Sequence, residues 1–141
     1  MKNKKVLLVI SLAIIFIVGI AIYSNTPTMK TISDQPNWKY EVMKDKKNSA
    51  ELQGVLSQKN KNDKMEIVSF YIKETSSDKQ VVTYTNKEVK AGLTEENYKN
   101  EKNPIFLEFP LGNTLDKGTE YSLILKYTIN DEVKVDEIKF K

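Results

Sequence analysis

The sequence predicts an all-β domain, a two-sheet antiparallel sandwich of seven strands, behind one apolar N-terminal helix. Short runs of alternating apolar and polar residues recur from Trp38 to Phe140, as half-buried strands require. Segments rich in Lys and Asn separate these runs, and the absence of long amphipathic helices between them argues against alternating β–α–β units. An uncharged apolar run precedes the first strand.

The apolar run covers residues 6–23, from Val6 to Tyr23, directly after a cluster of lysines. As a helix it is about 27 Å long, close to the roughly 30 Å hydrocarbon core of a bilayer. A transmembrane anchor and a signal peptide both begin in this way, and the length favours the anchor. Gly19 and Ala21 would permit cleavage after Ala21, so a secreted form stays open as the alternative. A buried helix is disfavoured because the run has no polar face.

The net charge of +3 belongs to the first five residues. Lys2, Lys4 and Lys5 precede the apolar run, and the other 19 of the 22 lysines equal the 19 acidic residues in number. Because positive residues stay in the cytoplasm, we expect residues 1–5 inside the cell membrane and the C-terminal domain outside. The balanced remainder argues against nucleic acid as a partner, since that binding needs clustered cations.

Residues 24–37 are polar, contain Pro27 and Pro36, and are expected to form an extended linker. The domain then spans residues 38–141. Its first four expected strands are residues 38–43, 50–56, 65–73 and 81–85. The third is apolar on both faces in its middle, which predicts a central strand.

Three further strands are expected at residues 105–111, 121–129 and 133–140. Asn130 and Asp131 tolerate the left-handed conformation of a tight hairpin turn. Val133 and Val135 occupy odd-numbered positions of the last strand, whereas Ile138 and Phe140 occupy even-numbered positions. Odd and even positions of a regular strand lie on opposite faces. A one-residue slip would turn every later side chain to the wrong face, so we expect a β-bulge near residues 136–137. Residues 93–100 are the one segment that looks helical.

Residues 115–127 read LDKGTEYSLILKY, which resembles the corner before the sixth strand of fibronectin type III domains. Leu115, Gly118, Thr119 and Tyr121 occupy the matching positions, and Lys117 stands where many members have Pro. The resemblance implies an immunoglobulin-like sandwich in which the strands follow the order A, B, C, C′, E, F, G. It also implies that Tyr121 is buried and donates its hydroxyl to the backbone near Leu115 and Asp116. The family implies a binding or spacer module without shared catalytic residues.

Candidate catalytic residues are few because the chain has neither His nor Cys. Ser76 and Lys79 match a Ser-x-x-Lys pattern, but that chemistry needs a buried helix, and these residues fall in a polar turn. The adjacent acids at residues 95–96 and 131–132 point to opposite faces if they lie on strands. We therefore expect no enzyme activity, no catalytic residue and no cofactor.

Two loops, residues 60–63 and 130–132, carry oxygen side chains that could bind calcium. Both lack the fixed spacing of several carboxylates around a turning Gly, so no metal is expected. Aromatic residues on strands usually pack in cores. Tyr84 and Tyr98 lie beside lysine-rich turns and are expected to be exposed aromatic contacts.

These observations predict an extracytoplasmic, membrane-anchored binding or structural module that is held by Val6–Tyr23 and contacts another protein of the cell envelope. The alternative is a secreted inhibitor or immunity-type protein, cleaved near Ala21, that acts on a hydrolase or toxin.

Overall fold

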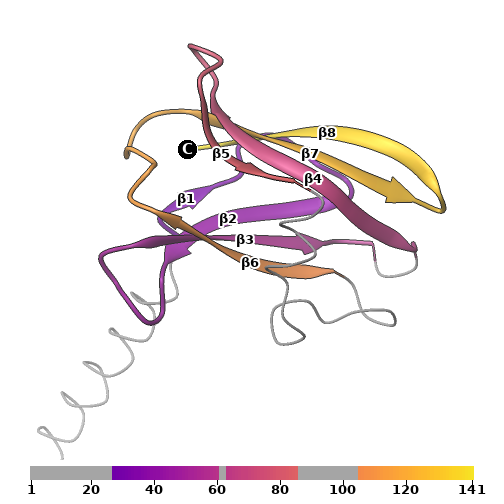
Figure 1. Ribbon diagram of the computed structural model, residues 1–141, viewed down its shortest axis with the longest axis horizontal. Coiled ribbons are helices and arrows are strands. Elements are labelled where there is room, and N and C mark those ends of the chain that lie inside the picture. Colours follow the sequence, from indigo (N-terminus) through magenta and orange to yellow (C-terminus); the bar gives the residue numbers. More distant parts are fainter. Residues whose placement is uncertain (1–26, 61–62, 86–104) are drawn as a thin grey trace, which may run out of the picture.

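The structure is a computed structural model that describes residues 27–60, 63–85 and 105–141. These residues form two antiparallel sheets of four strands each, which confirms the all-β, two-layer prediction (Figure 1). Sheet A has the order β1-β2-β3-β6, and sheet B has the order β5-β4-β7-β8. The strands are β1 (Met29–Lys30), β2 (Trp38–Lys44), β3 (Leu52–Gln58), β4 (Met65–Glu74), β5 (Gln80–Tyr84), β6 (Phe106–Gly112), β7 (Tyr121–Ile129) and β8 (Glu132–Phe140).

The expected count of seven strands is wrong, because the described residues contain eight. The additional strand is β1, which lies inside the segment expected to be a linker. It pairs with β2 through Met29 opposite Val42 and Lys30 opposite Glu41. Only two residues long, β1 has no periodicity that a sequence pattern could display. The folded domain therefore begins before Trp38.

The two strongest local predictions are confirmed. β4 lies inside sheet B, between β5 and β7, as expected of a strand that is apolar on both faces. Asn130 and Asp131 have φ values of 49° and 69°, the left-handed conformation that a two-residue type I′ hairpin turn needs. The β7–β8 hairpin leaves the sandwich at the right of Figure 1, with its turn at the outer margin of the molecule.

The bulge expected near residues 136–137 is absent. β7 and β8 pair without a register shift from Tyr121 opposite Phe140 to Ile129 opposite Glu132. No bulge is needed because Val133 and Val135 do not face the core, whereas Ile138 is fully buried. Register shifts occur instead in β4, between Ile67 and Ser69 opposite β7 and between Ile72 and Lys73 opposite β5, and in β3 opposite β6.

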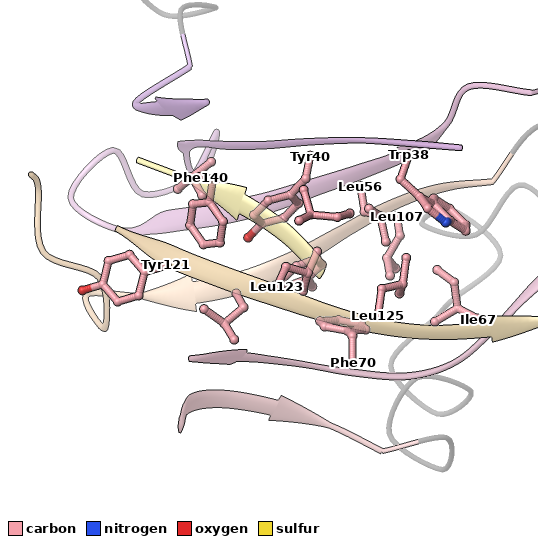
Figure 2. Close-up of a cluster of buried hydrophobic side chains, with 14 of the residues drawn as sticks. Trp38, Tyr40, Leu56, Ile67, Phe70, Leu107, Tyr121, Leu123, Leu125 and Phe140 are labelled. Atoms are coloured by element: carbon pink, nitrogen blue, oxygen red, sulfur yellow. The ribbon is translucent and has the colours of Figure 1, made fainter. Parts of the chain in front are cut away.

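A chain of aromatic rings crosses the core between the two sheets, and Figure 2 labels Tyr121, Phe140, Tyr40 and Phe70 among its members. Its ring centroids are 4.6–6.0 Å apart, in the order Tyr121, Phe140, Tyr40, Phe109, Phe70 and Tyr84. The first two rings belong to sheet B, the next two to sheet A and the last two to sheet B again. Contacts of this kind contribute about 0.5–1.5 kcal/mol each beyond their buried area. This series of aromatic rings therefore joins sheet A to sheet B.

Several expectations lie outside the described residues. They are the apolar run at residues 6–23, the helical segment at residues 93–100, the acids at residues 95–96 and Tyr98. Within the described ranges, no helix has the length and apolar character needed to cross a membrane.

Candidate functional site

The corner before β7 has Tyr121 at its centre. The backbone N–H of Asp116 donates to the Tyr121 hydroxyl oxygen at 2.9 Å, so the hydroxyl accepts the bond that it was expected to donate. The ring is 3% exposed and stacks on Phe140. Leu115 is buried beside it, and Gly118 has a φ of 88°, which only glycine adopts without strain. Thr119 closes the turn through its N–H and the Asp116 carbonyl, at 3.3 Å. The corner is a structural element.

Tyr84 was expected to be an exposed contact, and this expectation is wrong. Its side chain is half-buried, and its ring packs on Phe70 and Phe109 with centroids 4.9 and 5.5 Å apart. Its hydroxyl donates to the Pro110 carbonyl at 2.9 Å. Tyr84 therefore links β5, an edge strand of sheet B, to β6, an edge strand of sheet A.

The Ser-x-x-Lys segment forms the turn between β4 and β5. The hydroxyls of Ser76 and Ser77 both donate to the Glu74 carboxylate, at 3.0 and 2.8 Å. Lys79 closes the same turn through its carbonyl, which accepts from the Glu74 N–H at 2.9 Å. The two serines are exposed, so this arrangement is that of a solvated hairpin turn.

Acidic side chains do not converge in the described ranges, where no group of three or more metal-ligating residues occurs. Glu132 forms an ion pair with Lys134 at 3.2 Å. In the other candidate loop, the Asn60 amide donates to the Asp63 carboxylate at 2.5 Å. Each of these acids thus has a neighbouring protein group as its partner.

A polar cluster lies where β7 and β8 meet the residue before β2. The Tyr127 hydroxyl donates to Asp136 Oδ2 at 2.9 Å and accepts from the Asn37 amide at 3.1 Å. Its ring packs edge-on against Trp38, with centroids 5.1 Å apart. Burial raises the pKa of Tyr127, and the hydrogen bond to Asp136 raises it further. The raised pKa keeps the phenol protonated, and the cluster joins sheet A to the β7–β8 hairpin.

The outer edge of β8 has a covered half and an open half. Along the covered half, Lys30 and Lys141 exchange two backbone hydrogen bonds of 3.0 and 3.1 Å, and the Ile32 N–H donates to the Lys139 carbonyl at 2.8 Å. Lys139 also donates to the Ser33 hydroxyl at 2.9 Å. Residues 30–33 thereby close the sandwich between β2 and β8.

The open half contains Val133 and Val135, whose side chains are 59% and 61% exposed. Backbone groups alternate along an antiparallel strand, so these residues direct their N–H and C=O outward, as Lys139 does. Within the described ranges no strand pairs with them there. Their neighbours on β7 are Thr128 and Lys126, which also lie on the outer face. The open half is therefore an unpaired strand edge in solvent with two exposed valines, the best candidate for a contact surface.

Sequence reasoning missed this surface because it assigned both valines to the core. The alternation of side chains in the last strand already pointed to this surface. Two valines out of phase with Ile138 and Phe140 indicate either a bulge or an exposed apolar pair, and the structure has the exposed pair.

No known protein family, curated protein or solved structure matches this chain.

Proposed function

We propose that this chain is an extracytoplasmic, membrane-anchored, immunoglobulin-like module that binds another protein of the cell envelope and has no catalytic activity. The observation that carries the proposal is the open edge of β8, where Val133 and Val135 are exposed beside outward-directed backbone groups. Such an edge offers both main-chain hydrogen bonds and apolar contacts to an added strand.

The strand order supports the immunoglobulin-like assignment. If β2 to β8 are lettered A, B, C, C′, E, F and G, strand E lies beside B, and F lies between C and G. Immunoglobulin-type sandwiches have these neighbours. β5 pairs with β4, as its letter C′ requires. The bond between Tyr121 and Asp116 supplies the tyrosine corner of such domains.

The side-chain inventory supports a role in binding. The chain has no His or Cys, and its Ser-x-x-Lys segment is an exposed turn. Burial raises the pKa of Tyr40 and of Tyr127, so both phenols stay neutral. Neutral tyrosines in a packed core stabilise a fold and do not transfer protons at physiological pH.

The location follows from residues 6–23 and the lysines before them. Cell fractionation with intact-mass measurement tests it: the protein should be found in the membrane fraction at full mass. Ile15→Lys places a charge in the middle of the apolar run, where insertion costs about 2.5–3.5 kcal/mol more, and should reduce the membrane-bound fraction. Ile32→Lys is the matched control, because Ile32 is 56% exposed on the domain, and it should leave the location unchanged.

The same measurement separates the alternatives. A mature chain that begins after Ala21 and is free in the medium would replace the anchored module with the secreted inhibitor or immunity-type protein. Full-length protein in the cytosol would contradict both.

A further inference from the structure

We propose that the open edge of β8 pairs with the same edge of a second copy of this chain, antiparallel, with Val133 of each copy opposite Val133 of the other. The contact is isologous, so one strand edge supplies both sides. It joins two copies of sheet B into one continuous sheet. The inference rests on the proposed binding role of the β8 edge and deepens it, because the envelope protein that this edge binds is then a second copy of the chain itself.

The charges on β8 select this register. With Val133 opposite Val133, Glu132 of each copy lies opposite Lys134 of the other, which gives two cross-strand pairs of opposite charge. A shift that places Lys134 opposite Lys134 also places Glu132 opposite Asp136, and like charges directly opposite destabilise a sheet. Within one chain Glu132 Oε2 and Lys134 Nζ form an ion pair of 3.2 Å, and their side chains are 75% and 49% exposed, so both can exchange this partner for the one on the second copy.

The covered half of the edge excludes the register that has Val135 at its centre. With Val135 opposite Val135, the turn at residues 130–131 of the second copy would lie opposite Lys139 and Phe140. That position is already occupied, because Ile32 donates to Lys139 and Thr31 forms a bridge with Phe140. With Val133 at the centre, the turn of the second copy lies opposite residues 135–136. It then stops short of Glu137, whose carbonyl accepts from the Gln35 amide.

The exposed valines pack against each other on the outer face of the sheet in this arrangement. Val133 side chains lie opposite each other on the outer face of the joined sheet, and each Val135 lies diagonal to the second copy's Val133, within the reach of cross-strand packing. A lysine on an edge strand ordinarily discourages pairing. Here Glu132 of the second copy neutralises Lys134. The paired segment is short, so the association depends on the high local concentration that a shared membrane provides.

Disulfide trapping tests the register directly, because the chain has no cysteine of its own. Full-length chains that carry Val133→Cys, Lys134→Cys or Val135→Cys are expressed in cells and oxidised with copper phenanthroline. In the proposed register the Cα atoms are about 5.5 Å apart at residue 133, about 8 Å at residue 134 and about 14 Å at residue 135. A disulfide spans up to about 7 Å. We expect at least about tenfold more disulfide-linked dimer for V133C than for V135C, which is equally exposed.

Charge reversal separates pairing from misfolding. In the V133C chain, Glu132→Lys should reduce the dimer several-fold, because it places lysines opposite lysines. The double variant E132K/K134E restores two opposite-charge pairs and should restore the dimer. Both residues are exposed, so neither change disturbs the core.

Equal trapping at all three positions, no trapping at any of them, or no recovery in the double variant would overturn the proposal. A V133C adduct with a different protein would also overturn it, while leaving the proposed binding role of β8 intact. Fractionation of the same cells reports the location independently.

Discussion

Gly54 lies directly opposite Phe109 in sheet A, and the Phe109 ring occupies the space that a side chain at residue 54 would need. A Cβ atom at Gly54 would lie 2.4 Å from the ring Cζ and 2.8 Å from the Tyr40 hydroxyl. The glycine that interrupts the alternation of β3 thus allows two rings of the aromatic chain to pack.

Gly54→Ala should therefore destabilise the domain by about 1–3 kcal/mol, because the core must expand around the new methyl group. Urea denaturation measures the change. Phe109→Leu gives the added carbon room, so the double variant G54A/F109L should lose less stability than the two single losses added together. Strict additivity would contradict the steric explanation.

Tyr121→Phe tests the corner. The substitution removes the hydroxyl that accepts from the Asp116 N–H and keeps the buried ring, so unfolding should become easier by about 0.5–1.5 kcal/mol. Tyr71→Phe is the control, because the half-buried Tyr71 lies outside the aromatic chain of the core. Equal effects of the two substitutions would show that the corner bond adds no stability.

Two buried glutamines on β3 should differ in their importance. The Gln58 amide accepts from the Ile105 N–H at 3.0 Å and donates to the carbonyls of Asn60 and Asp63. Gln58→Leu removes the side chain that bonds these three backbone groups and should cost about 2–4 kcal/mol. Gln53→Leu should cost less or stabilise the domain, because the Gln53 amide nitrogen is buried without a partner. The reverse order in urea denaturation would contradict the hydrogen-bond assignment.

The buried tyrosines should make the domain sensitive to alkali. Burial raises the pKa of Tyr40, and the charge of Tyr84 raises it further. Burial also raises the pKa of Tyr127. The folded state then holds these protons to higher pH than the unfolded chain, whose tyrosines titrate near pH 10. The stability that these two tyrosines contribute to the folded state is fully present below about pH 10 and is lost as the pH rises further.

Tyr40→Phe removes one such proton. The free energy of unfolding should then fall less steeply in alkali, by about 1.4 kcal/mol per pH unit above pH 10. Denaturation midpoints between pH 8 and pH 11 measure the slope. An unchanged slope would show that Tyr40 does not contribute to the loss.

The parts of the fold that follow from local pattern could be predicted from sequence. Alternation along Tyr121–Ile129 predicted β7, and Asn130 and Asp131 predicted the turn because few other residues adopt positive φ. The strand β1 could not be predicted, since it is only two residues long and its pairing with β2 and its backbone bonds from Lys30 to Lys141 form only in the folded chain. The bridging role of Gln58 depends likewise on loops that meet only in the folded chain.

The candidate surface was hidden for another reason. Periodicity shows which residues share a face but does not show which face is buried, so Val133 and Val135 were assigned to the core. Only the register of β8 against β7 places them on the outside. Tyr84 was misassigned because its neighbours in sequence are polar, whereas its packing partners Phe70 and Phe109 come from β4 and β6.

Thiol labelling in intact cells tests most directly whether the β8 edge is presented outside the membrane. Full-length chains carrying Val135→Cys or Lys4→Cys each contain one thiol, and a membrane-impermeant maleimide reaches only thiols outside. We expect V135C to be labelled in intact cells and K4C only after the cells are lysed. Labelling of V135C only after lysis, or of both thiols in intact cells, would contradict an anchored module with its β8 edge outside.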